Sequence, residues 1–234
     1  MERKYRLTDE TIEFNGVKLY RIEALRDFGN VKKGEKGGFV QSELNLSHHG
    51  NCWIYEDAKA YGNSFVKEDA VLSNIAQIFD NAIATGSSRI LNGASVYQKS
   101  LICDYAIICD NAYVGGNAAV YGNAQVTDFS KVEGNSLVNG YAEISGAIIR
   151  CCSDYMVFKN WWSSLRHFTW TRSNNMWKVG CFYGTGKELI EKAYKDSELS
   201  GREYKRVVEY VESTLRDEIP RISTSVHITE IFKL

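Results

Sequence analysis

The stretch that decides the fold is AIICDNAYVGGNAAVYGNAQVTDFS, residues 106–130, in which a small residue returns at every sixth position. From Ala58 to Ala142 this step meets only Ala or Ser, at all fifteen positions, without an insertion or a gap. A second series lies two residues after the small one and begins one step earlier, at Ile54. From there to Ile144 a Val, Ile or Leu occurs at fourteen of its sixteen positions. Repetition of this regularity indicates a solenoid built from six-residue units.

The period of six also predicts the shape of each coil. Residues two apart in an extended chain point to the same side, so the small and the branched residue both face inward. Gly, Asn and Asp recur between these pairs, as in Gly62-Asn63 and Gly122-Asn123, and they accept the positive φ of a sharp turn. The sequence therefore predicts a mainly β fold, a triangular β-helix over about residues 52–145 with three sides to each coil.

The repeat divides the chain into three expected units. Residues 1–50 are predicted to form an N-terminal β cap with a hairpin turn at Asn15-Gly16, and residues 51–150 the β-helix. Residues 151–234 are predicted to form a small C-terminal α+β domain. It would contain a β-hairpin around residues 173–175, two helices opened by capping boxes at Thr185 and Ser200, and a final strand over 223–232.

The repeat resembles that of the hexapeptide-repeat, left-handed β-helix proteins, and the left hand is implied by that resemblance alone. The runs LYRIEAL (19–25), GGFV (37–40) and NLS (45–47) are similar to a lead-in found in phage and prophage members. The run GCFYGT (180–185) looks like the tail module that accompanies it. Some of these proteins are implicated in blocking bacterial immunity, including CRISPR nucleases. The resemblance thus implies an anti-defence, anti-CRISPR role.

One outward column of the predicted β-helix is apolar throughout. Residues eighteen apart stack in a column, and this one contains Phe65, Ile83, Leu101, Ala119 and Leu137. A contiguous apolar strip usually marks a covered surface. A second copy of the chain, the C-terminal segment and a foreign partner all fit as the cover. We expect a homodimer through this face of the β-helix.

The composition bears on the cellular location and on the classes of partner, and says little about the function. The formal net charge of −1 gives no global argument for a nucleic-acid or membrane partner, and direct nucleic-acid binding is left open. No apolar signal segment or membrane-spanning run occurs, and the six cysteines have no spacing suited to disulfides or zinc. We expect a cytoplasmic protein of an infected or lysogenic bacterial host, without a cofactor or a metal site.

Candidate catalytic residues are few. An acyltransferase on this scaffold would use a histidine base, and the histidines are His48, His49, His167 and His227, none within the regular coils. The run 181–188 fails as a phosphate loop, because Cys181 and Glu188 replace residues that such a loop requires. The unbroken register also favours a protein that is not an enzyme, since active sites are commonly carried on loops that leave a scaffold.

The C-terminal unit carries an aromatic and basic cluster with two interpretations. Its members, predicted as a possible partner-binding surface, are Trp161, Trp162, Arg166, Trp170, Arg172, Trp177 and Lys178. The tryptophans fit the core of a small domain. Exposed tryptophan beside arginine and lysine would instead stack on bases or anchor a protein partner, and we expect at least one tryptophan to be exposed.

The leading hypothesis is a non-enzymatic binding protein of phage type that inhibits a host defence complex, most plausibly as an anti-CRISPR acting on a nuclease effector. Its partner would be a host protein or nucleoprotein complex. The alternatives are a hexapeptide acyltransferase that uses acyl-CoA, a sponge for a nucleotide signal, and a structural scaffold protein. The repeat does not distinguish these four functions, because proteins with the same fold can have different functions.

Overall fold

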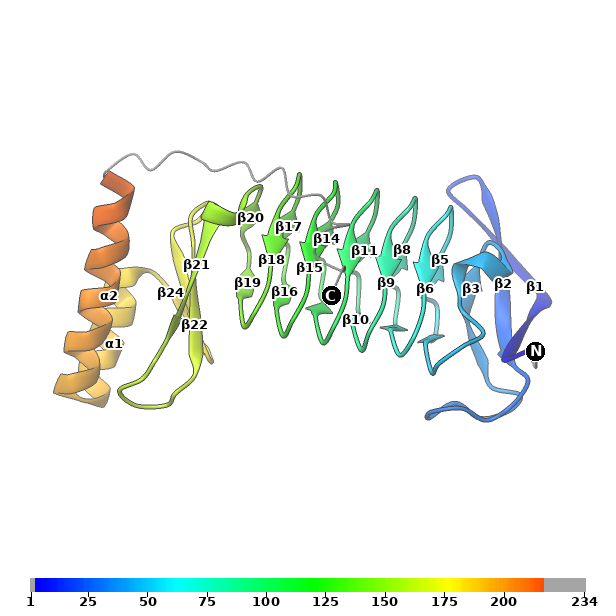
Figure 1. The fold of residues 1–234 in the computed structure, drawn as a ribbon, viewed down its shortest axis with the longest axis horizontal. Coiled ribbons are helices and arrows are strands. Elements are labelled where there is room, and N and C mark those ends of the chain that lie inside the picture. The colour runs from blue at the N-terminus through cyan, green and yellow to red at the C-terminus, as the bar shows by residue number, and fades with distance from the viewer. Residues whose placement is uncertain (1–2, 217–234) are drawn as a thin grey trace, which may run out of the picture.

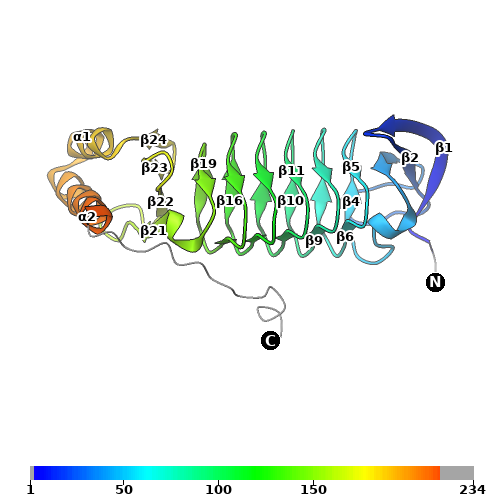
Figure 2. The ribbon, with the colours of Figure 1, turned by 90° about the horizontal axis from the view of Figure 1, so that it is seen from above.

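The computed structural model describes residues 3–216, which form an elongated molecule of three successive parts (Figures 1 and 2). A β-helix occupies the middle, and an antiparallel hairpin unit closes its N-terminal end. A four-stranded sheet and two helices lie at the other end. Within residues 3–216, neither helix is long and apolar enough to cross a membrane. The strand predicted over 223–232 and His227 lie outside the described residues.

The β-helix has three faces, each a parallel sheet of very short strands (Figure 2). The first face contains β4 (Trp53–Ile54), β7 (Val71–Leu72), β10 (Arg89–Ile90), β13 (Ile107–Ile108), β16 (Gln125–Thr127) and β19 (Glu143–Ser145). The second contains β5 (Lys59–Ala60), β8 (Gln77–Ile78), β11 (Ser95–Val96), β14 (Tyr113–Val114), β17 (Lys131–Val132) and β20 (Ile148–Ile149). The third contains β6 (Phe65–Val66), β9 (Ile83–Ala84), β12 (Leu101–Ile102), β15 (Ala119–Val120) and β18 (Leu137–Val138). The predicted β-helix is confirmed.

Backbone pairing keeps one register through the stack. Ile90 pairs with Ile108 and Ile108 with Val126, so each strand lies one full coil from its partner. The last coil is one residue shorter, because Lys131 pairs with Ile148. This shortening falls where the chain leaves the β-helix, so the regular repeat itself is uninterrupted.

The interior explains why the small position accepts only Ala or Ser. Its alanines and the branched residues two positions later are almost all completely buried. The serines there are buried as well, and most of their hydroxyls donate to backbone carbonyls, as from Ser64 to Ile78 at 3.1 Å and from Ser130 to Ile144 at 3.3 Å. The hydroxyl of Ser88 is the exception, buried without a partner among the described residues. A buried hydroxyl with an acceptor costs little, so serine replaces alanine without enlarging the side chain beyond the available space.

The corners are formed by residues in the left-handed region. Non-glycine residues such as Asp80 (φ 58°) and Asp104 (φ 56°) share this conformation with glycines such as Gly50 (φ 67°). At Gly50 a Cβ would stand 2.3 Å from the carbonyl oxygen of Glu68, so only glycine fits there. Acidic corner side chains join successive coils: the amide of Gly86 donates to Glu68 at 2.8 Å. The corners therefore hold the coils together as well as turning them.

The N-terminal unit continues the second face of the β-helix. β1 (Tyr5–Phe14) and β2 (Val17–Ala24) form an antiparallel hairpin, and β3 (Lys36–Val40) pairs with β2 on one side and with β5 on the other. The turn is at Asn15 and Gly16, both with positive φ, as the sequence predicts. A short helix η1 (Glu43–Asn45) follows, and the Asn45 amide donates to the carbonyls of Gly62 and Ser64. Backbone groups of the first coil are thus paired.

The C-terminal unit is an antiparallel sheet covered by two helices. A turn η2 (Cys152–Asp154) leads into β21 (Tyr155–Lys159), β22 (His167–Thr171), β23 (Met176–Val179) and β24 (Phe182–Gly184), followed by α1 (Gly186–Asp196) and α2 (Glu198–Arg216). Thr185 caps α1 together with Glu188, as predicted. The capping box predicted at Ser200 is wrong, because α2 begins at Glu198 and the hydroxyl of Ser197 accepts from the amide of Ser200.

The predicted apolar column lies on the third face. Its residues pair in register, Phe65 with Ile83 and Leu101 with both Ile83 and Ala119, and Leu137 continues the column. Phe65, Leu101 and Leu137 are half-buried, and Ile83 is 36% exposed. The column is therefore a continuous apolar strip on the outside of this single chain.

The interior should be far less tolerant than the outside of the same strand. Ile107 and Ile108 are consecutive in β13, the first half-buried and the second completely buried. Ile108→Ala should lower the free energy of unfolding by about 2–5 kcal/mol, because it leaves a cavity in a tightly packed prism. Ile107→Ala is the matched control and should cost about 1 kcal/mol or less. Urea unfolding followed by circular dichroism measures both, and equal losses would contradict this view of the core.

The apolar column should mediate self-association. Ile83→Lys with Leu101→Lys places two charges in the strip and should shift the protein to a smaller species in analytical ultracentrifugation, since a buried unpaired charge opposes association. The control is Gln77→Lys with Ser95→Lys, which adds the same charges to the second face. A wild-type protein that is already monomeric and well behaved would contradict the prediction.

Candidate active site

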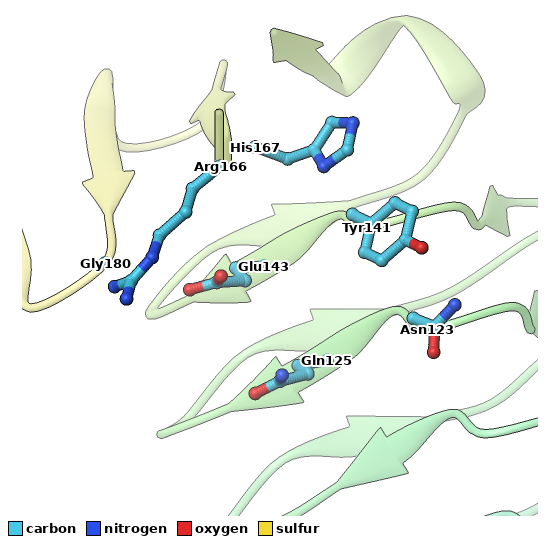
Figure 3. A pocket seen from close by; sticks show the side chains of 7 residues that line it. All are labelled: Asn123, Gln125, Tyr141, Glu143, Arg166, His167 and Gly180. Atoms are coloured by element: carbon cyan, nitrogen blue, oxygen red, sulfur yellow. The ribbon is translucent and has the colours of Figure 1, made fainter. Parts of the chain in front are cut away.

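A cavity lies where the last coils of the β-helix meet the C-terminal sheet. It has a volume of about 310 Å³. We call it the junction cavity, and it is lined by Asn123, Gln125, Tyr141, Glu143, Arg166, His167 and Gly180 (Figure 3). Its walls come from two successive coils on one side and from the ends of β22 and β23 on the other. The cavity therefore exists only because the two units pack together.

The coil side of the junction cavity uses outward positions of the regular repeat. Gln125 in β16 pairs with Glu143 in β19, and Asn123 and Tyr141 stand two residues before them in their coils. Glu143 therefore lies one coil after Gln125, and Tyr141 lies one coil after Asn123. Outward positions carry no packing role in the prism, so their side chains are free to serve a site.

The C-terminal sheet reaches the cavity because it closes the last coil. The hydroxyl of Thr169, in β22, accepts from the backbone amide of Glu143 at 2.9 Å. The hydroxyl of Ser173 accepts from the amide of Ile148 at 2.8 Å. These amides would bond to the carbonyls of a next coil if the β-helix continued. Because β22 takes the place of that coil, it brings His167 against Tyr141, and Arg166 lies at the edge of the same cavity.

His167 stacks on Tyr141. The two rings are parallel, with centroids 4.4 Å apart (Figure 3). Within residues 3–216 no hydrogen bond to either ring nitrogen of His167 is found, so both nitrogens can form hydrogen bonds with a bound molecule. A half-buried histidine held by ring stacking at a cavity is suited to general acid–base chemistry.

Glu143 is the second titratable group of the cavity. Its side chain is half-buried, and burial raises the pKa of its carboxyl, an effect opposed by the positive charge of Lys178. A carboxyl with a raised pKa exchanges protons closer to neutral pH than an ordinary glutamate. Glu143 and His167 therefore place two proton-transfer groups on one small volume.

A smaller cavity adjoins the junction cavity. It has a volume of about 150 Å³, and we call it the side cavity. Its lining residues are Asn160, Ser164, Arg166, His167, Val179, Gly180, Cys181 and Tyr204. Arg166, His167 and Gly180 line both cavities, so the two cavities are neighbours at the start of β22.

The other described histidines lie at the N-terminal end of the β-helix. His48 stacks on Tyr5 with centroids 4.4 Å apart, and its Nδ1 accepts from the amide of Lys4 at 3.2 Å. Its Nε2 is buried without a partner among the described residues. His49 is exposed. His48 is thus a packing residue, and His167 is the described histidine that lines the junction cavity.

The predicted tryptophan cluster is split by the fold. Trp170 and Trp177 are buried in the core of the C-terminal unit, 0% and 2% exposed, so their assignment to a partner-binding surface is corrected. They lie on the sheet face that α1 and α2 cover. Trp162 is half-buried against Tyr204, whereas Trp161 is 67% exposed. The bulk of the cluster thus fills a small domain.

The basic members of the cluster have separate environments. The Nε of Arg172 donates to the carbonyl of Ser153 at 3.3 Å, so this side chain holds the turn before β21. Lys178 acts electrostatically on Glu143. Arg166 lines both cavities. Of the predicted partner-binding residues, Arg166 is therefore the one that the structure places in the candidate site.

Sequence reasoning missed the coil half of the site. Asn123, Gln125, Tyr141 and Glu143 occupy ordinary outward positions, which look like solvent-facing residues in every coil. One signal was present: Tyr105, Asn123 and Tyr141 form a corner column that ends beside the last coil, and Tyr105 and Tyr141 are 66% and 53% exposed. Their role depends on which segment packs next to that column, and the repeat carries no information about that.

Comparison with known proteins adds one similarity. No protein-family model matches the chain. Over 99 residues the chain is 32% identical to a protein of Escherichia coli (strain K12) named an uncharacterized acetyltransferase, YdcK. The match covers 38% of this chain and 30% of the relative, so the chain spans well under two thirds of that protein. The match and the β-helix together support a hexapeptide-repeat protein.

This similarity overturns the prediction that the protein is not an enzyme, because the relative is named as an acetyltransferase. The prediction depended on the unbroken register, since sites are commonly built on loops that leave a scaffold. The structure supplies the physical reason for the error. The junction cavity is made from outward residues of regular coils and from the strand that closes them, and neither requires an interruption of the repeat.

The half-buried His48 at the other end of the β-helix should make stability depend on pH. Burial lowers the pKa of His48 below its usual value of 6.5. As pH falls below about 6.5, the unfolded chain binds a proton that the folded chain excludes, so stability present at neutral pH is lost. The melting temperature should therefore fall between pH 7.5 and pH 5, by about a few degrees. His48→Gln should flatten this dependence, and His49→Gln, the exposed control, should leave it unchanged.

Proposed function

We propose that the protein transfers an acyl group from a thioester donor such as acyl-coenzyme A to a small acceptor bound in the junction cavity. The observation that carries this proposal is the similarity to a protein named an acetyltransferase. The cavity supports it, because it combines a histidine, a carboxyl with a raised pKa and polar side chains at the outside of a hexapeptide-repeat β-helix.

The reaction requires one proton-accepting group near the acceptor. His167 removes a proton from the acceptor's hydroxyl or amine as that oxygen or nitrogen attacks the thioester carbonyl carbon. A new C–O or C–N bond forms, the C–S bond breaks, and the thiolate leaves with the proton that His167 has taken. Tyr141 holds the imidazole ring in place by stacking. Glu143 stands in the same cavity as a second proton-transfer group.

The donor has room along the outside of the β-helix. The junction cavity opens at the corner column that contains Tyr105, Asn123 and Tyr141. The column runs parallel to the axis of the β-helix, and the two tyrosines are exposed. A long donor lying along this column would present its thioester at the closed end, beside His167.

The predicted inhibition of a host defence complex stays a prediction. It rests on the resemblance of residues 19–25, 37–40, 45–47 and 180–185 to phage and prophage proteins. The predicted homodimer through the third face also stays a prediction, as do the sponge for a nucleotide signal and the structural scaffold. Acyl transfer is favoured here because it uses the titratable groups of the junction cavity directly.

Acyl transfer is tested by incubating the full-length chain with acetyl-CoA and a panel of amines and hydroxyl compounds, with release of free thiol as the readout. His167→Asn should lower kcat/KM by about 10²- to 10⁴-fold, because the acceptor loses its base. Glu143→Gln should lower it less. His49→Asn, which alters an exposed histidine at the far end of the β-helix, is the control and should retain the activity.

Two results would contradict the proposal. One is the absence of acetyl-CoA binding in calorimetry together with the absence of thiol release with every acceptor. The other is thiol release that survives unchanged in both cavity variants, which would place the chemistry elsewhere. Circular dichroism of each variant shows that a loss of activity is not a loss of folding.

A further inference from the structure

Arg166 lines the candidate site but has no role in the proton transfers assigned to His167 and Glu143. It extends past the junction cavity towards Gly180 (Figure 3). It also lines the side cavity, so one arginine side chain borders both cavities. A guanidinium presents planar N–H donors that match the geometry of a carboxylate or phosphate.

The backbone around Arg166 holds this side chain at the cavity. The carbonyl of Arg166 accepts from the amide of Asn160 at 2.8 Å, which closes the loop between β21 and β22. Within that loop the amide of Ser163 donates to the Asn160 side chain at 2.9 Å. Gly180 has φ 55°, and a Cβ there would stand 3.9 Å from Nη1 of Arg166. The guanidinium of this exposed side chain therefore lies close to the backbone of Gly180, at the edge of both cavities.

Arg166 has no anionic partner within residues 3–216. No salt bridge or hydrogen bond of its guanidinium is found there, although Arg21 in the N-terminal unit pairs with both Glu10 and Asp57. The carboxylate of the junction cavity, Glu143, interacts with Lys178. The site thus contains a charged, fork-shaped donor group that the protein itself leaves unpaired.

We propose that the acyl acceptor is a small molecule with a carboxylate or a phosphate group, which Arg166 binds while the acceptor's amine or hydroxyl lies beside His167. This inference rests on the proposed acyl transfer and specifies its substrate class. The lining supports a polar acceptor, because Asn123 and Gln125 contribute amides on the opposite wall. The junction cavity, with a volume of about 310 Å³, has room for a small molecule.

The binding half of the proposal is tested without any reaction. The full-length protein is titrated with sodium acetate and, separately, with inorganic phosphate, at constant ionic strength held with sodium chloride, while NMR follows the histidine ring signals. The His167 signals, assigned from His167→Asn, should shift with saturation. Arg166→Gln should abolish this shift and Arg166→Lys should weaken it. Arg89→Gln, which removes an exposed arginine of β10, is the matched control and should leave it unchanged.

The substrate half uses matched pairs of acceptors with acetyl-CoA. An amino acid is compared with its amide, and a sugar phosphate with the free sugar, so that carboxylate and phosphate are tested separately. Arg166→Gln should lower kcat/KM for the anionic member of the preferred pair by about 10- to 100-fold, mainly through KM, because one charged hydrogen-bonded pair is lost. The preference for the anionic over the neutral member should fall with it, whereas the control Arg89→Gln should leave kcat/KM for both members unchanged.

The outcomes separate this inference from the proposed function. Saturable binding of acetate or phosphate that depends on Arg166, without acyl transfer to any acceptor, would support the anion site and contradict the acyltransferase. Acyl transfer that favours neutral acceptors and is unaffected by Arg166→Gln would support the acyltransferase and overturn the anionic acceptor. A shift of His167 that persists in Arg166→Gln would also overturn it, because the anion would then bind elsewhere.

Discussion

Backbone pairing between residues one coil apart is the interaction on which the rest of this structure depends. Each strand of the β-helix contains only two or three residues, which is too few to be stable alone. It gains its stability by pairing with the equivalent strands of the coils above and below it. That stacking requires the regular coils to have the same length and the same narrow interior, and the coil length changes only at the end of the stack, where Lys131 pairs with Ile148. Ala or Ser near each corner and a branched residue two positions later satisfy both requirements at once.

A stack of this kind leaves unpaired backbone groups at both ends, and the two ends are closed differently. At the N-terminal end β3 adds to the second face, and the buried Lys4 donates to the carbonyl of Cys52 at 2.8 Å. At the C-terminal end side chains of the β22–β23 hairpin, Thr169 and Ser173, accept from the exposed amides. Because side chains and not backbone groups accept these hydrogen bonds, β22 does not pack on the last coil as another coil would. The junction cavity is the space between them.

The site is therefore a consequence of how the β-helix ends. A regular coil offers rows of outward side chains that are not needed for packing, and a second unit placed over the last row turns some of them into the wall of a cavity. A candidate site of this kind needs no loop inserted into the repeat. Tyr141 shows this most directly, since it is an ordinary corner residue that becomes the support of His167 only at the closed end.

The sequence by itself determined the β-helix, its period, its inward and outward residues and the glycine and asparagine corners, because each of these follows from local geometry repeated many times. It also predicted the hairpin at Asn15-Gly16 and the cap at Thr185, which depend on neighbouring residues only. It did not predict that Trp170 and Trp177 are buried while Trp161 is exposed, or that Asn123, Tyr141, Arg166 and His167 share a cavity. Those facts depend on how one unit docks on another. Contacts between units do not produce a repeating pattern in the sequence, so they cannot be predicted from the period.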